Sequence, residues 1–98
     1  MRVRYALRAL ADLEAIFAYF DIHAPATAQA LRSAIKRAIG GLEEFPYVGP
    51  PTDEPGTRVL TLTRYRYRIY YEVDAQAEVI TILHIRHTSR RPLRSSRR

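Results

Sequence analysis

The stretch RYRYRIYYEVDAQAEVITILHIRH, residues 64–87, decides the fold of this chain. Its first ten residues alternate between polar and apolar side chains, a period of two that predicts a strand over residues 64–73. Residues 74–77 predict a turn. Residues 78–87 predict a further strand, and the nearly continuous apolar run VITIL within it favours a central position in a sheet. With a shorter strand expected over residues 58–62, the second half of the chain predicts a three-stranded meander.

The first half of the chain follows a helical period instead. A first helix is expected from residue 8 to residue 20, because apolar side chains recur there every three or four residues, at Leu10, Leu13, Phe17 and Phe20. Pro25 suits the first turn of a second helix. That helix presents its own apolar stripe, formed by Ala28, Leu31, Ile35, Ala38 and Leu42. The connection would be about four residues long and would contain His23, and Gly40-Gly41 would loosen the second helix near its end.

These elements assemble into one small α+β domain. Residues 2–5 alternate and predict a short first strand, and the proline-rich residues 46–56 predict the loop between helices and meander. The order is therefore β-α-α-β-β-β, with a helical hairpin packed on one face of a mainly antiparallel sheet in two layers. We expect the domain to span residues 1–87 and residues 88–98 to form a mobile basic tail.

Positive charge gathers at the C-terminal end. The chain has a formal net charge of +6, and residues 86–98 contain six arginines and no acidic residue. Residues 1–85 sum to zero. This distribution predicts an anionic partner, for which nucleic acid, an acidic protein segment and a membrane surface are the candidates; a merely solubilising tail is the alternative.

Several classes of protein are excluded. The absence of cysteine excludes a disulfide framework, a zinc finger and a thiol nucleophile. No apolar run reaches the ~18 residues of a membrane span, and the N-terminus lacks a signal-peptide core, so we expect a cytoplasmic protein without membrane association. His84 and His87 are three residues apart on one strand and therefore point to opposite faces. With His23 elsewhere, we expect no metal site and no cofactor.

The parity of the two long strands divides their side chains between two faces. Tyr67, Ile69, Tyr71 and Val73 suit the helix-packed face. On the next strand, one face would carry Val79, Thr81, Leu83 and Ile85, and the other would carry Ile80, Ile82, His84 and Arg86. If the apolar faces align, the exposed side gathers a cationic, aromatic-bearing set, namely Arg66, Arg68, Tyr70, His84 and Arg86. An ordinary solvated sheet face with cross-strand charge pairs is the alternative.

The two histidines of this region suggest different roles. His84 lies with the arginines and is a candidate general acid or base, because its ordinary pKa is near ~6.5. His87 lies at the end of its strand, where capping or hydrogen bonding within the fold is the other interpretation.

In this order and at this length, the segments resemble the RelE/ParE superfamily of toxins from type II toxin–antitoxin systems. The resemblance covers ALRALADLEAIFAYF (6–20), LEEFPYVG (42–49), Arg58 at the start of the sheet, and YRIYYEVDAQAEVITILHIRHTSRR (67–91), which ends in a His-x-x-Arg signature. One departure is Ala6, where the family often has a Ser or Thr helix cap.

The resemblance implies one of two activities on the same fold. RelE-like members cleave mRNA on the ribosome, and ParE-like members poison DNA gyrase. Arg68 occupies the position of an arginine that RelE-like ribonucleases carry, so a ribonuclease would use Arg68, His84, Arg86 and Arg90. The tail TSRRPLRSSRR has no tyrosine or histidine for proton transfer, and the lysine-rich patch of several ribonucleases is missing. We therefore favour inhibition of gyrase, with the ribonuclease and a degenerate toxin that only binds antitoxin as alternatives.

Both activities imply the same kind of regulation. A cognate antitoxin would bind the toxin, and operator DNA would be contacted only through that antitoxin. The target would be gyrase or, alternatively, the ribosome with its mRNA. The residues expected to bind partners are Arg58, Arg66, Tyr70, His87, Arg91 and Arg94.

Overall fold

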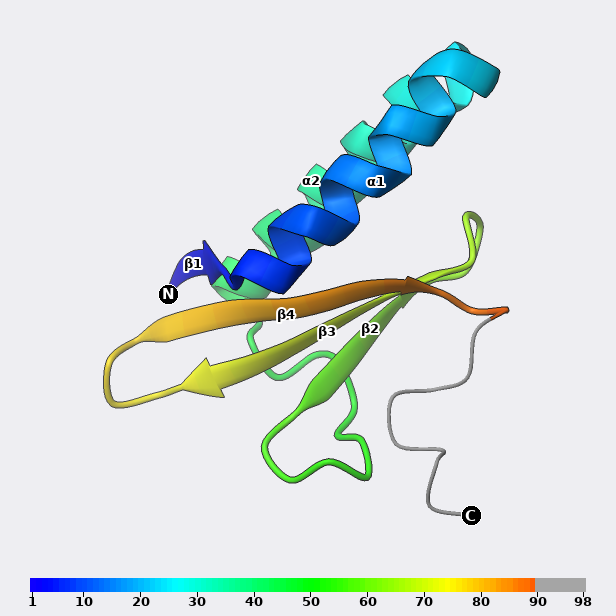
Figure 1. Cartoon of the computed structure of the whole chain (residues 1–98). Helices are drawn as coiled ribbons and strands as arrows, with labels where there is room; N and C mark the ends of the chain where they lie inside the picture. Colours follow the sequence, from blue (N-terminus) through cyan, green and yellow to red (C-terminus); the bar gives the residue numbers. More distant parts are fainter. Residues whose placement is uncertain (90–98) are drawn as a thin grey trace.

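The computed structural model describes residues 1–89 and has two layers (Figure 1). Its elements follow the predicted order, β1 (Arg2–Tyr5), α1 (Leu7–His23), α2 (Pro25–Glu44), β2 (Arg58–Leu62), β3 (Tyr67–Asp74) and β4 (Val79–His87). The antiparallel hairpin of α1 and α2 covers one face of a four-stranded sheet. The predicted α+β architecture is confirmed.

The sheet has the strand order β1-β4-β3-β2. β1 runs parallel to β4, whereas β2 with β3 and β3 with β4 are antiparallel. β4 is therefore central, as its apolar run predicted. β1 has only four residues and pairs only with Val79–Ile82. Beyond Ile82, β4 consequently has no strand beside it on that edge within the described chain.

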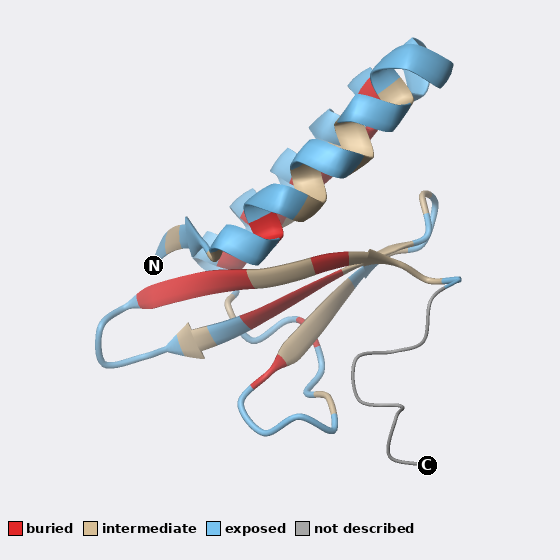
Figure 2. Cartoon of the chain, in the orientation of Figure 1, coloured by how far each residue is buried: buried red, intermediate tan, exposed pale blue. Residues whose placement is uncertain are grey.

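The core lies between the sheet and the helical hairpin (Figure 2). Ile69 and Tyr71 of β3 are fully buried there, and Tyr67 and Val73 pack against them, which confirms the predicted helix-facing set. α2 contributes Leu31, Ile35, Ile39 and Leu42, and α1 contributes Ala9. Burial of each large aliphatic side chain stabilises the fold by roughly 1.5–3 kcal/mol.

The helices differ from the prediction at their ends. The connection is a single residue, Ala24, and His23 is the last residue of α1 rather than part of a turn. α2 continues through Gly40 and Gly41 to Glu44, and the buried Ile39 and Leu42 on either side of the glycines pack in the core. Ala6 precedes α1 without a side-chain cap, as its methyl group requires.

One residue of the predicted apolar stripe of α1 was assigned to the wrong face. Leu10 is 48% exposed, whereas Leu13, Phe17 and Phe20 pack against the core. Ala9 occupies the buried position instead, because its small side chain lets α1 approach β4 closely.

Two strands also begin later in the chain than predicted. β3 begins at Tyr67, since residues 63–66 form the turn of the β2–β3 hairpin and Arg66 adopts a left-handed φ of 62°. The backbone N–H of Arg66 donates to the Leu62 carbonyl at 2.8 Å and closes that turn. The prediction that Arg66 belongs to the strand face was therefore wrong. Glu78, with a φ of 57°, likewise lies in the β3–β4 turn rather than in β4.

β4 contains a β-bulge that the alternation pattern did not predict. Tyr70 pairs with His84 and Tyr71 with Ile82, so Leu83 is an extra residue in β4. A bulge reverses the parity of the residues that follow it. Ile82 and Ile85 therefore both reach the core, and the predicted strict alternation of β4 was wrong.

Neither α1 nor α2, the helices of the described residues, is long and apolar enough to cross a membrane.

Candidate functional site

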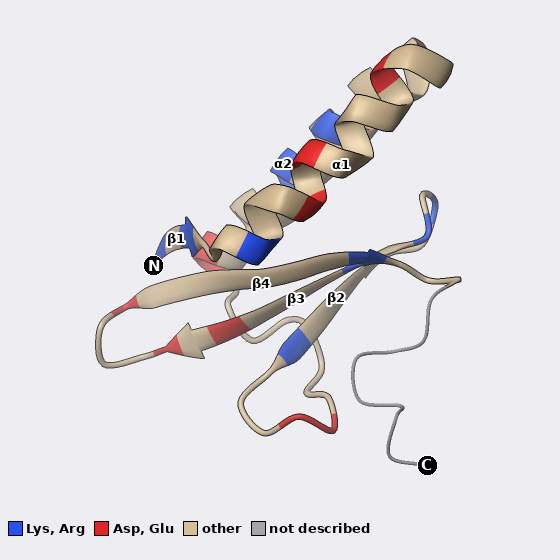
Figure 3. Ribbon diagram, in the orientation of Figure 1, with Lys and Arg blue, Asp and Glu red and all other residues tan. Residues whose placement is uncertain are grey.

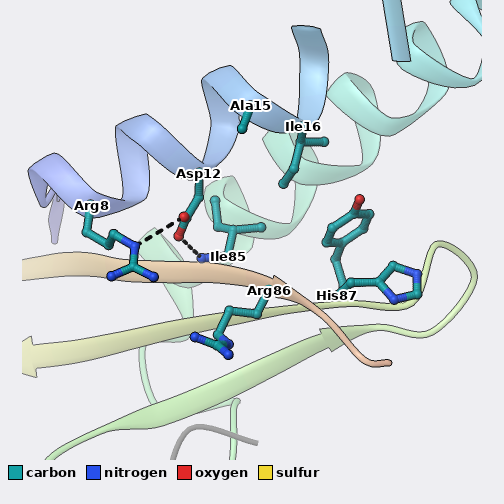
Figure 4. Close-up of a pocket in the computed structure, with 8 residues that line it drawn as sticks. Arg8, Asp12, Ala15, Ile16, Ile85, Arg86 and His87 are labelled. Atoms are coloured by element: carbon teal, nitrogen blue, oxygen red, sulfur yellow. Dashed lines mark hydrogen bonds and ion pairs between the residues drawn. The ribbon is translucent and has the colours of Figure 1, made fainter. Parts of the chain in front are cut away.

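The outer face of the sheet carries a pair of arginines. Arg68 of β3 and Arg86 of β4 are direct cross-strand partners, and both lie on the face opposite to Ile69 and Ile85 of the core. Figure 4 shows the Arg86 side chain directed away from α1. Arg68 Nη1 and Arg86 Nε are buried atoms that have no hydrogen-bond acceptor within the described chain. Two guanidinium groups thus lie opposite each other on this face, and each has a buried nitrogen whose hydrogen-bonding capacity is unused.

Tyr70 and His84 form the next cross-strand pair on this face. Tyr70 is only 3% exposed, so the prediction that it lies on an open surface was wrong. Burial lowers the pKa of His84, the nearby cations of Arg8 and Arg86 lower it further, and Asp12 opposes them. His84 is therefore held in its neutral form at physiological pH.

A carboxylate from α1 covers the edge of β4 where β1 has ended (Figure 4). The Ile85 N–H donates to Asp12 Oδ2 at 3.0 Å, so the carboxylate replaces a strand partner. Arg8 Nε donates to Asp12 Oδ1 at 3.4 Å, and His84 Nδ1 lies 3.9 Å from Asp12 Oδ2. A cavity of about 150 Å³ opens beside this contact, between α1 and the end of β4.

His87 lies on the other side of β4, at the rim of that cavity. Its ring packs edge-on against Tyr67 with the centroids 5.1 Å apart. The Ser89 N–H donates to His87 Nδ1 at 3.0 Å, and Ser89 Oγ lies 2.8 Å from the same nitrogen. His84 and His87 are thus separated, as the parity of the strand predicted, and one ring nitrogen of His87 is engaged within the fold.

Arg58, a predicted partner-binding residue, holds the loop that precedes the sheet. Its Nη1 donates to the carbonyls of Tyr47 at 3.2 Å and Gly49 at 2.7 Å, and its guanidinium lies 5.0 Å from the centre of the Tyr47 ring. Tyr71 fixes the same loop from inside, because its hydroxyl donates to the Pro46 carbonyl and accepts from the Gly49 N–H. Arg58 therefore has an internal role in positioning this loop.

The remaining candidates lie near or beyond the end of β4. Arg66 sits in the hairpin turn, where its carbonyl accepts from the Thr88 N–H at 2.7 Å. Arg90, Arg91 and Arg94 lie outside the described residues, as does most of the predicted tail. Sequence reasoning assigned no role to Asp12 and Arg8. The sequence feature that could have indicated a role for Asp12 is its place on the same side of α1 as Ala9 and Ile16, which pack against the core.

Comparison with known proteins shows the family of this chain. Residues 3–92 match the family model described as the ParE toxin of the type II toxin–antitoxin system parDE. A Sinorhizobium fredii protein, Y4kP, whose name assigns it provisionally as a toxin, is 35% identical over 83 residues, which cover 85% of this chain and 86% of the relative.

Solved structures share the fold. The chromosomal ParDE system of P. aeruginosa contains a chain that is 28% identical, with a TM-score of 0.76, and the match covers 89% of this chain and 95% of that one. A chain of the RelBE2 toxin–antitoxin complex of Mycobacterium tuberculosis is 27% identical, with a TM-score of 0.63 and coverage of 88% and 95%. The isolated E. coli RelE toxin, at 16% identity and a TM-score of 0.69, resembles this chain in fold alone; that match covers 97% of this chain and 92% of RelE.

The fold and these similarities define a toxin of the RelE/ParE superfamily. Within that class, the chain belongs to the ParE toxin family of type II toxin–antitoxin systems.

Proposed function

We propose that this toxin arrests growth by binding and inhibiting DNA gyrase in the cytoplasm, without catalysing a reaction itself. The match of residues 3–92 to the ParE toxin family is the observation that carries the proposal. The state of His84 supports it. A lowered pKa reduces the protonated fraction of His84 at neutral pH, which disfavours this side chain as a general acid for a leaving group.

A cognate antitoxin neutralises the toxin in this proposal. The solved relatives include ParDE and RelBE2 assemblies, and the same kind of partner suits this chain. α1 offers it a surface, because Leu7 is 84% exposed, Ile22 is 77% exposed and Leu10 is half exposed. An amphipathic antitoxin segment that folds on binding would bury these side chains.

A supercoiling assay tests the gyrase proposal. Purified toxin is added to gyrase, ATP and relaxed plasmid, and the topoisomers are resolved with and without the protein encoded by the adjacent small gene. We expect supercoiling to fall with added toxin and to recover with the antitoxin. Unchanged supercoiling at a large molar excess of folded toxin would refute the proposal, and normal growth of cells that express it would identify a degenerate toxin.

The arginine pair favours one other candidate, a ribosome-dependent ribonuclease. The unused donors of Arg68 and Arg86 are suited to stabilise negative charge on a phosphate during strand cleavage. In this alternative, induction of the toxin cleaves ribosome-bound mRNA, and Arg68→Ala abolishes the cleavage. Primer extension on transcripts from induced cells separates the two candidates, since intact transcripts are expected if gyrase is the target.

A further inference from the structure

Charge is segregated along the β3–β4 pair (Figure 3). Residues 62–71 and 83–89, which meet at the end of the sheet that holds the β2–β3 turn, contain no acidic residue. They carry Arg64, Arg66, Arg68 and Arg86, here called the arginine end. The opposite end of the β3–β4 hairpin carries Glu72 and Asp74 on β3 and Glu78 in the turn. The net charge of residues 1–85 is zero, but positive and negative side chains are concentrated at opposite ends of the β3–β4 pair.

The arginine end lacks internal counter-charges. None of its four arginines forms an ion pair with another described residue, whereas Arg8 pairs with Asp12 and Arg32 with Asp21 elsewhere in the fold. Arg64 only stacks on the Tyr65 ring, 5.6 Å from its centre. The positive charge of this end is thus available to a partner.

Arg68 and Arg86 are placed at an energetic disadvantage. Like charges directly opposite each other on neighbouring strands are destabilising. Each residue also buries a nitrogen without an acceptor, and an unsatisfied buried donor carries a desolvation cost. An oxyanion between the two guanidinium groups would remove both costs, because it separates the like charges and accepts from both donors.

We infer that the arginine end binds the phosphodiester backbone of duplex DNA, so that the toxin itself contacts the DNA held by gyrase; the gyrase part rests on the proposed function. Directly opposed residues have Cα atoms about 5 Å apart, so Arg68 and Arg86 can share one phosphate. Arg64 and Arg66 extend the charge along the hairpin turn to further phosphates. Arginine is suited to this contact because its planar fork matches a phosphate group.

The spread of the charge favours a polyanion over a single carboxylate. The four arginines come from two strands and a turn rather than from a single point on the sheet. A row of phosphates offers each of these groups a partner, and every phosphate neutralised releases counterions. This contact is separate from the sequence-based expectation that operator DNA is bound only through an antitoxin, because it concerns the DNA held by gyrase.

Fluorescence anisotropy with a labelled random-sequence duplex tests the inference, with the full-length toxin and no gyrase. The affinity is measured over a range of NaCl concentrations for the wild type, for R68Q/R86Q and for the control R2Q/R32Q. The control loses the same charge at positions away from the arginine end. We expect the slope of log K against log[NaCl] to become shallower by about 0.9 to 1.8 in R68Q/R86Q, for a shared phosphate or two separate ones, and to stay unchanged in R2Q/R32Q.

Four results would overturn the inference, and the first is a failure of the wild-type toxin to bind the duplex. Equal losses in both double variants would show an effect of net charge alone. Tighter binding of an acidic peptide of the same length would identify a protein segment as the ligand, and tighter binding of single-stranded RNA would identify an RNA surface. Because gyrase is absent, the outcome is independent of the supercoiling assay: inhibition without DNA binding would refute only the DNA contact, and DNA binding without inhibition would refute only the gyrase proposal.

Discussion

The two faces of the β3–β4 pair differ in whether their buried polar atoms have hydrogen-bond partners. On the helix-packed face, the Tyr71 hydroxyl has both a donor and an acceptor from the neighbouring loop, and Ile69 and Ile82 are fully buried. On the outer face, Arg68 and Arg86 stand opposite each other with buried nitrogens that lack acceptors. Buried polar atoms in native proteins are generally satisfied, so the unsatisfied arginine nitrogens distinguish the outer face from the helix-packed face and support the anion site proposed above.

The largest effect is expected on the helix-packed face. Ile82→Ala removes a fully buried side chain and leaves a cavity, which should lower the free energy of unfolding by about 2–5 kcal/mol. Urea unfolding followed by circular dichroism measures the loss. Leu10→Ala is the matched control on α1 and should change the stability by less than about 0.5 kcal/mol, since Leu10 is half exposed. A comparable loss in both variants would contradict the assignment of Leu10 to the surface.

An intermediate effect is expected at the boundary between the two faces, where Asp12 covers the edge of β4. Asp12→Ala leaves the Ile85 N–H without its acceptor and should cost about 1–3 kcal/mol. Asp12→Asn keeps a side-chain oxygen at the same place and should retain most of the stability, because the exposed pair with Arg8 contributes little. Hydrogen exchange of the Ile85 amide measures the contact directly. Equal protection of that amide in Asp12→Ala and in the wild type would rule out the capping role.

On the outer face, substitutions should increase the free energy of unfolding rather than decrease it. Arg68→Gln relieves a like-charge pair and should raise the free energy of unfolding by about 0.2–1 kcal/mol, a gain that thermal unfolding detects. Arg86→Gln should do the same, whereas the two gains should not add, because either change alone abolishes the repulsion. A loss of stability in both variants would make the arginines structural and would remove the energetic argument for a ligand between them.

Sequence patterns predicted the helix-packed face better than the outer one. The period of two in β3 assigned Ile69 and Tyr71 correctly, because burial of apolar side chains follows the pleat. The bulge at Leu83 was missed, since an apolar run such as VITIL satisfies either parity and the choice depends on packing against the helices. The position of Arg66 was missed because the length of a hairpin turn depends on the register of the strands that it joins.

The contacts of the candidate site were harder to predict for a related reason. Asp12 and Ile85 are 73 residues apart, and only the end of β1 at Tyr5 creates the open strand edge that the carboxylate covers. The segregation of charge was visible in the order of Arg68, Glu72 and Asp74 along one strand. Summing the charges over residues 1–85 concealed it.

The smallest expected effect is a change in the pH dependence of stability, and it arises from His84 on the outer face. Burial, Arg8 and Arg86 lower the pKa of His84 in the folded state below its unfolded value of about 6.5. The unfolded chain therefore binds the proton more readily, so the contribution of His84 to stability is complete above about pH 6.5 and is lost as the pH falls below that value. The midpoint of urea unfolding, measured between about pH 7.5 and 5.5, should fall less in His84→Gln than in the wild type. Arg86→Gln should also weaken the dependence, because it removes one of the two cations that oppose protonation. An unchanged pH dependence in His84→Gln would show that His84 is not desolvated, and it would leave the imidazole available for the acid–base role that a ribonuclease requires.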